Sequence, residues 1–225
     1  MLLMTAGVPT NATLVVDDLS VALPAPLTTG FFDTTAPFGE LTDSATSTLT
    51  HADRLFDTRE VTLTQSSGSA ATNNGLFFTI NASQGFNISS NGAAGTIELT
   101  YSMADGSTID FLTNDIKEIT LNSFDLPFGE PLIIDIDIED NTGATGSVSQ
   151  SITSAVTSSL PINFPLGTLS SLDFSEVKIL TITFNLPDAG DLNFGDITLI
   201  PEPGSIALAG LASGLLLTSR RRFRA

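Results

Sequence analysis

The sequence predicts an all-β protein, a two-sheet antiparallel sandwich of jelly-roll type, followed by a single apolar helix at the C-terminus. Short apolar and threonine-rich runs alternate with clusters of Gly, Asn, Asp, Ser and Pro, which commonly separate strands. Helical periodicity is scarce before the C-terminal segment, and about ten strands in one domain favour two packed sheets. The 225 residues, 41% of them hydrophobic, suffice for one well-packed domain.

The chain divides into three regions. Residues 1–12 hold no basic residue and only a very short apolar run, although Thr10 and Ala12 suit the small-residue positions of a signal-peptidase site. We interpret 1–12 as a remnant of a signal peptide or a misassigned start, with the true start upstream. Residues 13–200 form the expected β-sandwich domain, and 201–225 form a separate C-terminal segment.

Eleven segments have the length and apolar content of strands. In chain order they are 13–23, 59–65, 75–81, 84–90, 95–103, 107–113, 118–126, 132–140, 146–156, 177–186 and 192–200. Seven of the 15 Phe residues fall in these segments, mostly at core-facing positions. We therefore expect a core rich in Phe, Ile and Leu.

Alternation is clearest in the segment 132–140, where four aliphatic residues share one face and three carboxylates share the other. The carboxylates are Asp135, Asp137 and Glu139. Asp140 and Asn141 follow at the strand end, so these residues could complete a calcium site. No Asp-Gly calcium-loop signature accompanies them, and a solvated strand face is the alternative interpretation. No other cofactor is indicated.

The charge balance excludes nucleic acid as a partner. The formal net charge is -17, and the chain has eight Lys and Arg residues. Four of these are Arg220, Arg221, Arg222 and Arg224, in the last six positions. The remaining body is too poor in cations to neutralise a phosphate backbone. The chain has no Cys, which excludes disulfides and thiolate zinc sites.

Catalytic patterns are weak, so we do not expect an enzyme. His51 is the only histidine, and the charged residues around it, Asp53, Arg54, Asp57, Arg59 and Glu60, favour surface ion pairs over general-base chemistry. A G-x-S-x-G nucleophile turn is absent. The 25 acidic residues do not single out a glycosidase pair. With no Trp and only one Tyr, Tyr101, an aromatic sugar-stacking surface is poorly supplied.

The C-terminal segment predicts a membrane helix. Residues 204–219 carry no charge and would span roughly 24 Å as a helix. This is short of a hydrocarbon core of about 30 Å, but flanking arginines can extend to the interface. The arginine cluster would keep the C-terminus cytoplasmic and the acidic body outside. A last core helix of the domain is the alternative.

These parts, in this order, resemble the PEP-CTERM protein-sorting signal. Pro201, Glu202 and Pro203 match its tripeptide, Ser205 to Thr218 its apolar helix, and the four arginines its basic end. The resemblance covers the last 25 residues. It implies an exported protein that is transiently anchored in the inner membrane. An exosortase-type membrane transpeptidase would then cleave it near the tripeptide and release it to the cell surface or the extracellular space.

From the sequence we therefore expect an exported cell-envelope or extracellular-matrix protein with a structural, adhesive or exopolysaccharide-associated role. Two alternatives stay open for the body: a calcium-dependent carbohydrate-binding module and a secreted polysaccharide hydrolase. The resemblance is confined to the tail, so it does not distinguish them.

Overall fold

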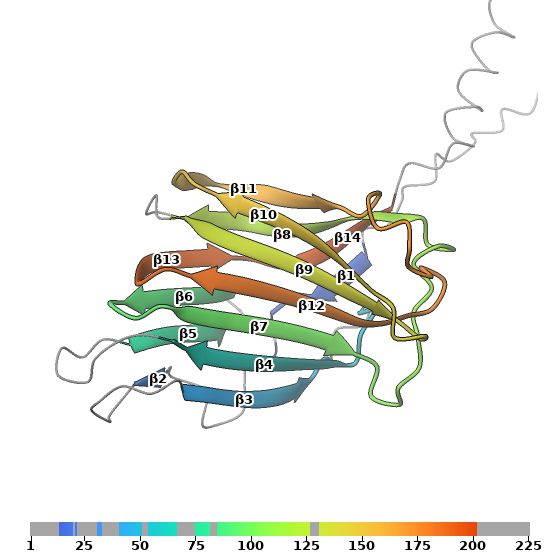
Figure 1. Cartoon of the computed structure of the whole chain (residues 1–225), viewed down its shortest axis with the longest axis horizontal. Helices are drawn as coiled ribbons and strands as arrows, with labels where there is room; N and C mark the ends of the chain where they lie inside the picture. Colours follow the sequence, from blue (N-terminus) through green and yellow to red (C-terminus); the bar gives the residue numbers. More distant parts are fainter. Residues whose placement is uncertain are drawn as a thin grey trace, which may run out of the picture.

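The computed structural model describes residues 14–19, 21, 31–32, 41–50, 54–66, 75–81, 85–126 and 131–201. The regular secondary structure of this part is β-strand, and the strands form two antiparallel sheets (Figure 1). The predicted two-sheet sandwich is confirmed. The predicted C-terminal helix falls outside the described residues.

The larger sheet contains eight of the described strands. Their order is β1, β14, β8, β13, β6, β5 and β2, and β11 also pairs with β8. The strands are β1 (Leu14–Asp17), β2 (Phe31–Phe32), β5 (Gly75–Asn81), β6 (Gly85–Asn91), β8 (Ile116–Leu126), β11 (Val156–Pro165), β13 (Ala189–Phe194) and β14 (Ile197–Pro201).

The smaller sheet contains six described strands in the order β10, β9, β12, β7, β4 and β3, which follow one another from top to bottom in Figure 1. They are β3 (Leu41–Thr48), β4 (Thr58–Gln65), β7 (Gly95–Ser102), β9 (Leu132–Asp140), β10 (Thr145–Ile152) and β12 (Val177–Leu186). The chain crosses repeatedly between the two sheets, so each strand pair is supported by packing from the other layer.

The core lies between the sheets because apolar side chains alternate along each strand. In β7 and β9, every second residue is buried. A cluster of phenylalanines joins the layers. The ring centroid of Phe194 on β13 lies 4.9 Å from that of Phe86 on β6 and 5.2 Å from that of Phe184 on β12. The expected Phe-rich core is therefore confirmed.

Several segments differ from the sequence prediction, among them the short strand β2, which was not predicted. Strand β3 was not predicted because Ala45 is the only apolar residue after Leu41 within it. Most of β11 was missed because it contains two prolines, which a strand tolerates best at a sheet edge. Among the described strands, β11 pairs with β8. The predicted strand 107–113 is instead largely turn, joined to β12 by an isolated bridge at Ile109.

Candidate functional site

The outer face of the smaller sheet is lined by hydroxyl groups, and we call it the hydroxyl face. Inward residues of its strands are apolar, so alternation places the polar residues between them on the outside. Its described serines and threonines are Ser44, Thr46, Thr48, Thr58, Thr62, Thr64, Thr96, Thr100, Ser102, Thr145, Ser147, Ser149, Ser151, Thr181 and Thr183.

Strand register arranges these side chains in rows that cross the whole sheet. One row runs through Ser149, Asp135, Thr183, Glu98, Thr62 and Ser44. The next runs through Ser147, Asp137, Thr181, Thr100, Glu60 and Thr46. With neighbouring strands about 4.8 Å apart, each row extends over roughly 24 Å. The face is thus a broad, regular array of donors and acceptors.

Hydrogen bonds orient several groups of this array. Asn185 Nδ2 donates to Asp135 Oδ2 at 2.7 Å. The Thr100 hydroxyl donates to Glu98 Oε1 at 3.3 Å and lies 3.4 Å from the Thr181 hydroxyl. Each contact occupies one lone pair of the Asp135 or the Glu98 carboxylate. The other lone pairs can accept hydrogen bonds from a ligand.

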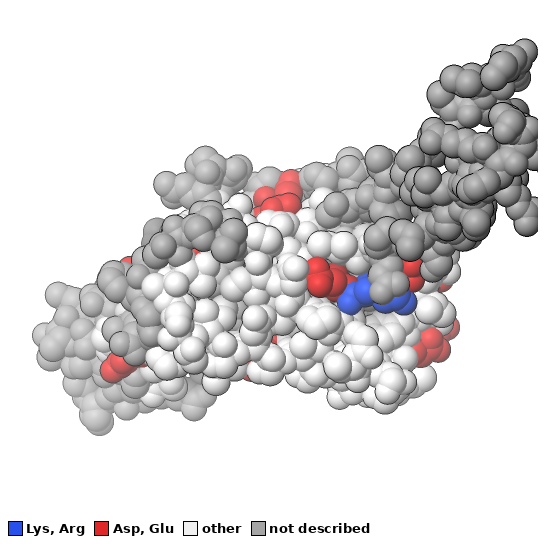
Figure 2. Space-filling model, turned by 90° about the horizontal axis from the view of Figure 1, so that it is seen from above, with Lys and Arg blue, Asp and Glu red and all other residues white. Residues whose placement is uncertain are grey.

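The hydroxyl face carries more negative than positive charge. Its five carboxylates are Glu60, Glu98, Asp135, Asp137 and Glu139. Within the described part of the chain, no ion pair joins any of them to a cation, because the paired cations have other partners. Arg54 pairs with Asp57 at 3.3 Å and Lys117 with Asp115 at 3.1 Å. Figure 2 views the molecule from above rather than onto this face, and the described charged residues appear there as small separate groups.

The structure does not gather the four residues of the predicted calcium site. Asp135, Asp137 and Glu139 stand on the hydroxyl face, whereas Asp140 is buried. No group of three or more His, Asp or Glu side chains able to hold a metal ion occurs among the residues described. The other three carboxylates are partly exposed on the outer side of β9.

Asp140 instead closes the turn between β9 and β10. Its Oδ1 accepts hydrogen bonds from the Thr142 amide at 2.8 Å and the Thr142 hydroxyl at 2.7 Å. Oδ1 also accepts from the Ala144 amide, and Oδ2 accepts from the Asp173 amide, both at 3.1 Å. The Thr142 hydroxyl bond, followed by the Asp173 amide bond, lowers the pKa of Asp140 from 3.8 to about 2. Its role is structural.

A second polar set crosses the larger sheet, and we call it the amide row. It consists of Asn87 on β6, Asn193 on β13 and Asp125 on β8, which the register places side by side on the outer face. All three side chains are partly exposed. Among the described residues, Asn87 Nδ2 and Asp125 Oδ1 are shielded from solvent and have no hydrogen-bond partner. Unpaired buried polar atoms are rare in native proteins.

The local backbone explains why Asp125 belongs to this row. The register between β8 and β11 shifts between Leu121 and Phe124, and Ser123 has a φ of 53°. This irregularity has the character of a β-bulge, which re-aims the side chains beyond it. At the other end, Gly85 has a φ of +72°, and a Cβ there would lie 2.2 Å from the Phe194 carbonyl oxygen. Only glycine fits this close approach of β6 to β13.

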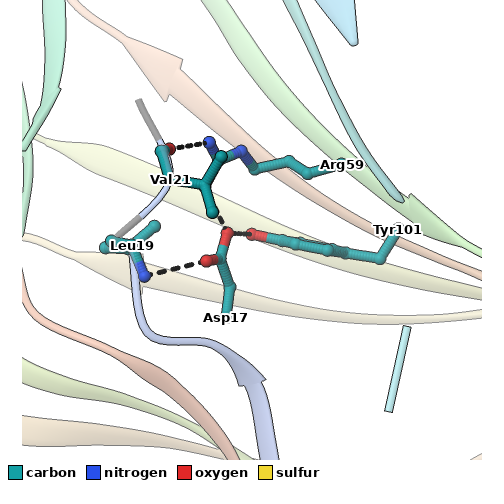
Figure 3. A network of polar contacts seen from close by, with 5 residues as sticks. All are labelled: Asp17, Leu19, Val21, Arg59 and Tyr101. Carbon is teal, nitrogen blue, oxygen red and sulfur yellow. Dashed lines mark hydrogen bonds and ion pairs between the residues drawn. The ribbon is translucent and has the colours of Figure 1, made fainter. Parts of the chain in front are cut away.

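A third polar set lies inside the sandwich (Figure 3). Arg59 on β4 and Tyr101 on β7 are direct cross-strand partners, and Asp17 reaches them from β1 of the other sheet. Arg59 Nη1 donates to Asp17 Oδ2 at 2.6 Å, and the Tyr101 hydroxyl donates to the same oxygen at 3.1 Å. Asp17 Oδ1 accepts from the Leu19 amide at 2.8 Å. We call Asp17, Arg59 and Tyr101 the buried cluster.

The buried cluster contains a partner of Arg59 that the sequence did not suggest, and it accounts for the raised pKa of Tyr101. The sequence suggested a nearby acid as partner for Arg59, but the structure pairs it with Asp17, far away in the chain. Arg54 does take a nearby acid, Asp57. Burial, reinforced by the charge of Asp17, raises the pKa of Tyr101 well above 10. Tyr101 is fully enclosed, so it offers no stacking surface to a sugar. His51 lies outside the described residues.

Of the sorting motif, the structure describes Pro201 alone. It is the last residue of β14, with Ile116 of β8 as its cross-strand partner. Glu202, Pro203 and the arginines at 220, 221, 222 and 224 lie outside the described residues, as does the segment 204–219. Within the described ranges, no helix has the length and hydropathy to cross a bilayer.

Comparison with known proteins finds similarity in backbone structure but not in sequence. No protein-family model matches the chain, and no curated protein sequence is similar to it. A family 30 carbohydrate-binding module has a TM-score of 0.42 at 12% identity, over 85% of this chain and 99% of that one. The family 30 module of the cellulosomal cellulase Cel9D-Cel44B of Clostridium thermocellum has a TM-score of 0.41 at 15% identity, over 85% and 98%.

Two larger proteins show a similar likeness over part of their length. The agarase AgWH50C has a TM-score of 0.41 at 10% identity, over 57% of this chain. This chain spans only 22% of that agarase and 20% of a second protein, PfGH50B. TM-scores this low do not transfer an activity, so a function has to be supported by the residues of this chain.

The sequence alone could not reveal the amide row. Asn87, Asn193 and Asp125 are separated by 38 to 106 positions, and none stands in a recognisable motif. Asn87 is the first residue of an N-x-Ser sequon, but this pattern is frequent in a chain so rich in Asn and Ser. The hydroxyl face is easier to recognise in the sequence, because β4 and β12 each contain a Thr-x-Thr alternation.

Proposed function

We propose that this chain is an exported cell-envelope protein whose β-sandwich binds an extracellular polysaccharide without cleaving it. The observation that carries the proposal is the hydroxyl face, where six strands present hydroxyls and carboxylates in continuous rows. Each sugar hydroxyl both donates and accepts hydrogen bonds, as do the Ser and Thr groups of this face. An extended polymer can therefore bond to many groups at once.

The polymer is expected to be neutral. The five carboxylates of the hydroxyl face, which form no ion pair with the described residues, repel polyanions such as polyuronates, since like charges at close range are unfavourable. A neutral polysaccharide avoids this cost and offers hydroxyl donors to the carboxylate oxygens. Each such bond contributes only about 0.5–1.5 kcal/mol net, so affinity depends on several contacts along a row.

Binding without cleavage follows from the layout of the carboxylates. Glycoside hydrolysis needs two carboxylates on opposite sides of one glycosidic bond. Glu98 and Asp135 share a row but stand on an open sheet face, two strand spacings apart, about 10 Å. Both point to the same side of the sheet. They are placed to contact a polymer lying on the face rather than to enclose a sugar ring.

The second part of the proposal concerns the tail. We infer that the PEP-CTERM-like segment is a sorting signal that a transpeptidase removes after export. The supporting observation is that β14 ends at Pro201, the first residue of the tripeptide. Cleavage beyond this residue therefore removes none of the described strands. C-terminal mass spectrometry of the native protein tests this inference: a chain ending near Pro203 outside the cell supports it, and a membrane-bound chain that keeps Arg220 to Ala225 contradicts it.

Binding is tested by affinity electrophoresis of the full chain in gels containing a neutral β-glucan, a galactan or polygalacturonate. We expect retardation by at least one neutral polymer and none by polygalacturonate. The double variant Thr181→Val and Thr183→Val removes two hydroxyls from the centre of the face while keeping β-branched side chains. Its affinity should fall about tenfold, the loss of two bonds.

The matched control is Thr168→Val, which removes an exposed hydroxyl from the loop before β12. Its mobility in the gels should equal that of the unchanged chain. Retardation that the two central substitutions leave unchanged would contradict the hydroxyl face as the binding site. Release of new reducing ends would contradict binding without cleavage.

A further inference from the structure

We infer that strand β10 is a self-association surface, along which two copies of this chain pair antiparallel to form a dimer with one continuous sheet. The inference goes beyond the proposed function and does not depend on it. Strand β10 lies at the edge of the smaller sheet and pairs with β9 on one side. The other side of an edge strand presents backbone N–H and C=O groups that a further strand can bind.

The first observation is that β10 lacks the features that keep most edge strands from pairing. Those features are shortness, proline, irregular register and charged side chains. Among the other described edge strands, β1 and β2 contain four and two residues, β11 contains two prolines and shifts its register against β8, and β3 carries Asp43. Strand β10 has eight residues in unbroken register with β9, and it contains neither proline nor charge.

The second observation concerns charge. Residues 141–172 include β10, β11 and the loop after β11, and none of them is charged, although the formal net charge of the chain is -17. Figure 2 looks down on the side of the molecule where β11 and β10 lie uppermost in Figure 1, and most of the described surface there is uncharged. Two copies with the same net charge repel one another least where the surfaces that meet are neutral.

The third observation is that β10 is complementary to itself. Around a twofold axis, antiparallel pairing places residues from the same face of the strand opposite one another. On the inner face, Val148 is only half-buried against the core, and a second strand would cover it further. The outer face presents hydroxyls, which can each donate and accept a hydrogen bond. These belong to Thr145, Ser147, Ser149 and Ser151. A strand identical to β10 therefore suits both faces, so the partner is a second copy of this chain.

The edge is also held in place by the packing beneath it. A Cβ at Gly146 would lie 2.9 Å from Leu172 Cδ1 and 3.2 Å from Leu169 Cδ2, so the strand lies directly on these two buried leucines. At its other end Ile152 is buried, and Asp140 fixes the turn that leads into the strand. Strand β10 is thus ordered before a partner arrives, which lowers the entropy cost of binding.

Pairing through β10 would join the hydroxyl faces of the two copies. A twofold axis perpendicular to the sheet keeps both outer faces on the same side, so the row through Ser149 and Asp135 continues into the second copy. A polymer long enough to reach both copies then binds with an avidity that exceeds the affinity of one face. This consequence rests on the proposed function, whereas the dimer itself does not.

The test is sedimentation velocity of the full chain over a dilution series, in a mild non-ionic detergent and without polysaccharide. We expect a monomer–dimer equilibrium, because one strand pair buries less surface than a permanent dimer interface. Gln150→Lys and Gln150→Glu each place a charge on the inner side of the paired strands, at a position that is exposed in the monomer. Both should raise the dissociation constant at least tenfold. An effect of net charge alone would have opposite signs in the two variants.

Controls locate the contact. Thr46→Lys adds a cation to β3, the opposite edge of the same sheet, and should leave the equilibrium unchanged. The chain has no Cys, so Ser149→Cys supplies a single thiol. When the pairing is centred on Val148 or Ser149, the two thiols lie within about 8 Å of each other. A short thiol-to-thiol cross-linker should therefore join two copies of Ser149→Cys but not two copies of Thr46→Cys. If a charge at position 150 lowers the melting temperature, this cross-link decides.

The outcomes separate this inference from the proposed function. A chain that sediments as a monomer up to about 1 mM overturns the inference. Dimers that neither Gln150 variant weakens also overturn it, since association then occurs through the C-terminal segment or another edge. Opposite effects of the two variants would assign association to net charge and overturn it as well. None of these results decides the proposed function, which the gel retardation of the chain by neutral polymers tests separately.

Discussion

The buried cluster and the amide row are both polar sets that join three strands, yet they differ in how their bonding groups are used. In the buried cluster, both Asp17 oxygens accept hydrogen bonds, and the Arg59 charge is neutralised at 2.6 Å. In the amide row, a donor on Asn87 and an acceptor on Asp125 have no partner among the described residues.

This difference indicates different roles. A fully enclosed charge is tolerated only when it is paired and hydrogen-bonded, so the buried cluster is built for stability of the closed sandwich. Arg59 Nε is its one unpaired atom in the part of the chain described. The amide row leaves two shielded polar atoms without a partner among the described residues, which costs stability. Four measurements can break or sharpen the comparison.

The largest effect is expected for Arg59→Leu. The variant leaves the Asp17 carboxylate buried without its cation, and removal of one partner of a buried pair costs about 3–5 kcal/mol. Urea denaturation should show this decrease in the free energy of unfolding. Arg54→Leu is the matched control, since its pair with Asp57 is one-third exposed and should contribute no more than about 1 kcal/mol. Equal losses in both variants would remove the distinction between buried and surface pairs.

The next effect is expected for Tyr101→Phe. The substitution keeps the ring contact with Phe56, at 6.0 Å between centroids, but removes the hydroxyl that donates to Asp17 Oδ2. A hydrogen bond to a charged group contributes about 1.5–3 kcal/mol, so the free energy of unfolding should fall by this amount. An unchanged urea midpoint would show that Arg59 and the Leu19 amide satisfy Asp17 by themselves.

The opposite sign is expected for the amide row. Asn87→Leu combined with Asp125→Leu should raise the free energy of unfolding by about 1–2 kcal/mol, because two unpaired buried atoms are removed. Asp191→Leu, on the same face in the neighbouring register pair, should give no gain. A loss of stability in the double variant would place the row with the buried cluster as a structural feature.

The smallest effect is a pH dependence at the β9–β10 turn. The folded chain holds the pKa of Asp140 at about 2, below its usual 3.8, so the folded state binds this proton less readily than the unfolded state. Its stabilising contribution is therefore complete above about pH 4 and is lost as the pH falls toward 2. Between pH 5 and pH 2.5, the urea midpoint should therefore fall less in Asp140→Asn than in the unchanged chain. An identical pH response in both chains would contradict this role.

The sequence predicted the fold better than the sites. Alternation in the segment 132–140 was strong enough to place Ile134 in the core and Asp137 outside, and both positions are as expected. The calcium hypothesis added Asp140 to the outer carboxylates because it stands at the strand end, although the same period of two places it on the buried side. In the structure the Asp140 side chain is buried and bonds to the amides that follow it.

By itself, the sequence determined the all-β class, the apolar core between two sheets and the hydroxyl-rich outer positions, because these depend on a two-residue period that each strand carries locally. Only the tertiary structure decided which distant polar residues meet. Asp17 reaches Arg59 because β1 lies in the opposite sheet, and Asn193 lies between Asn87 and Asp125 because three strands pair in one register. Such contacts depend on strand order and register across the whole chain, which no local period encodes.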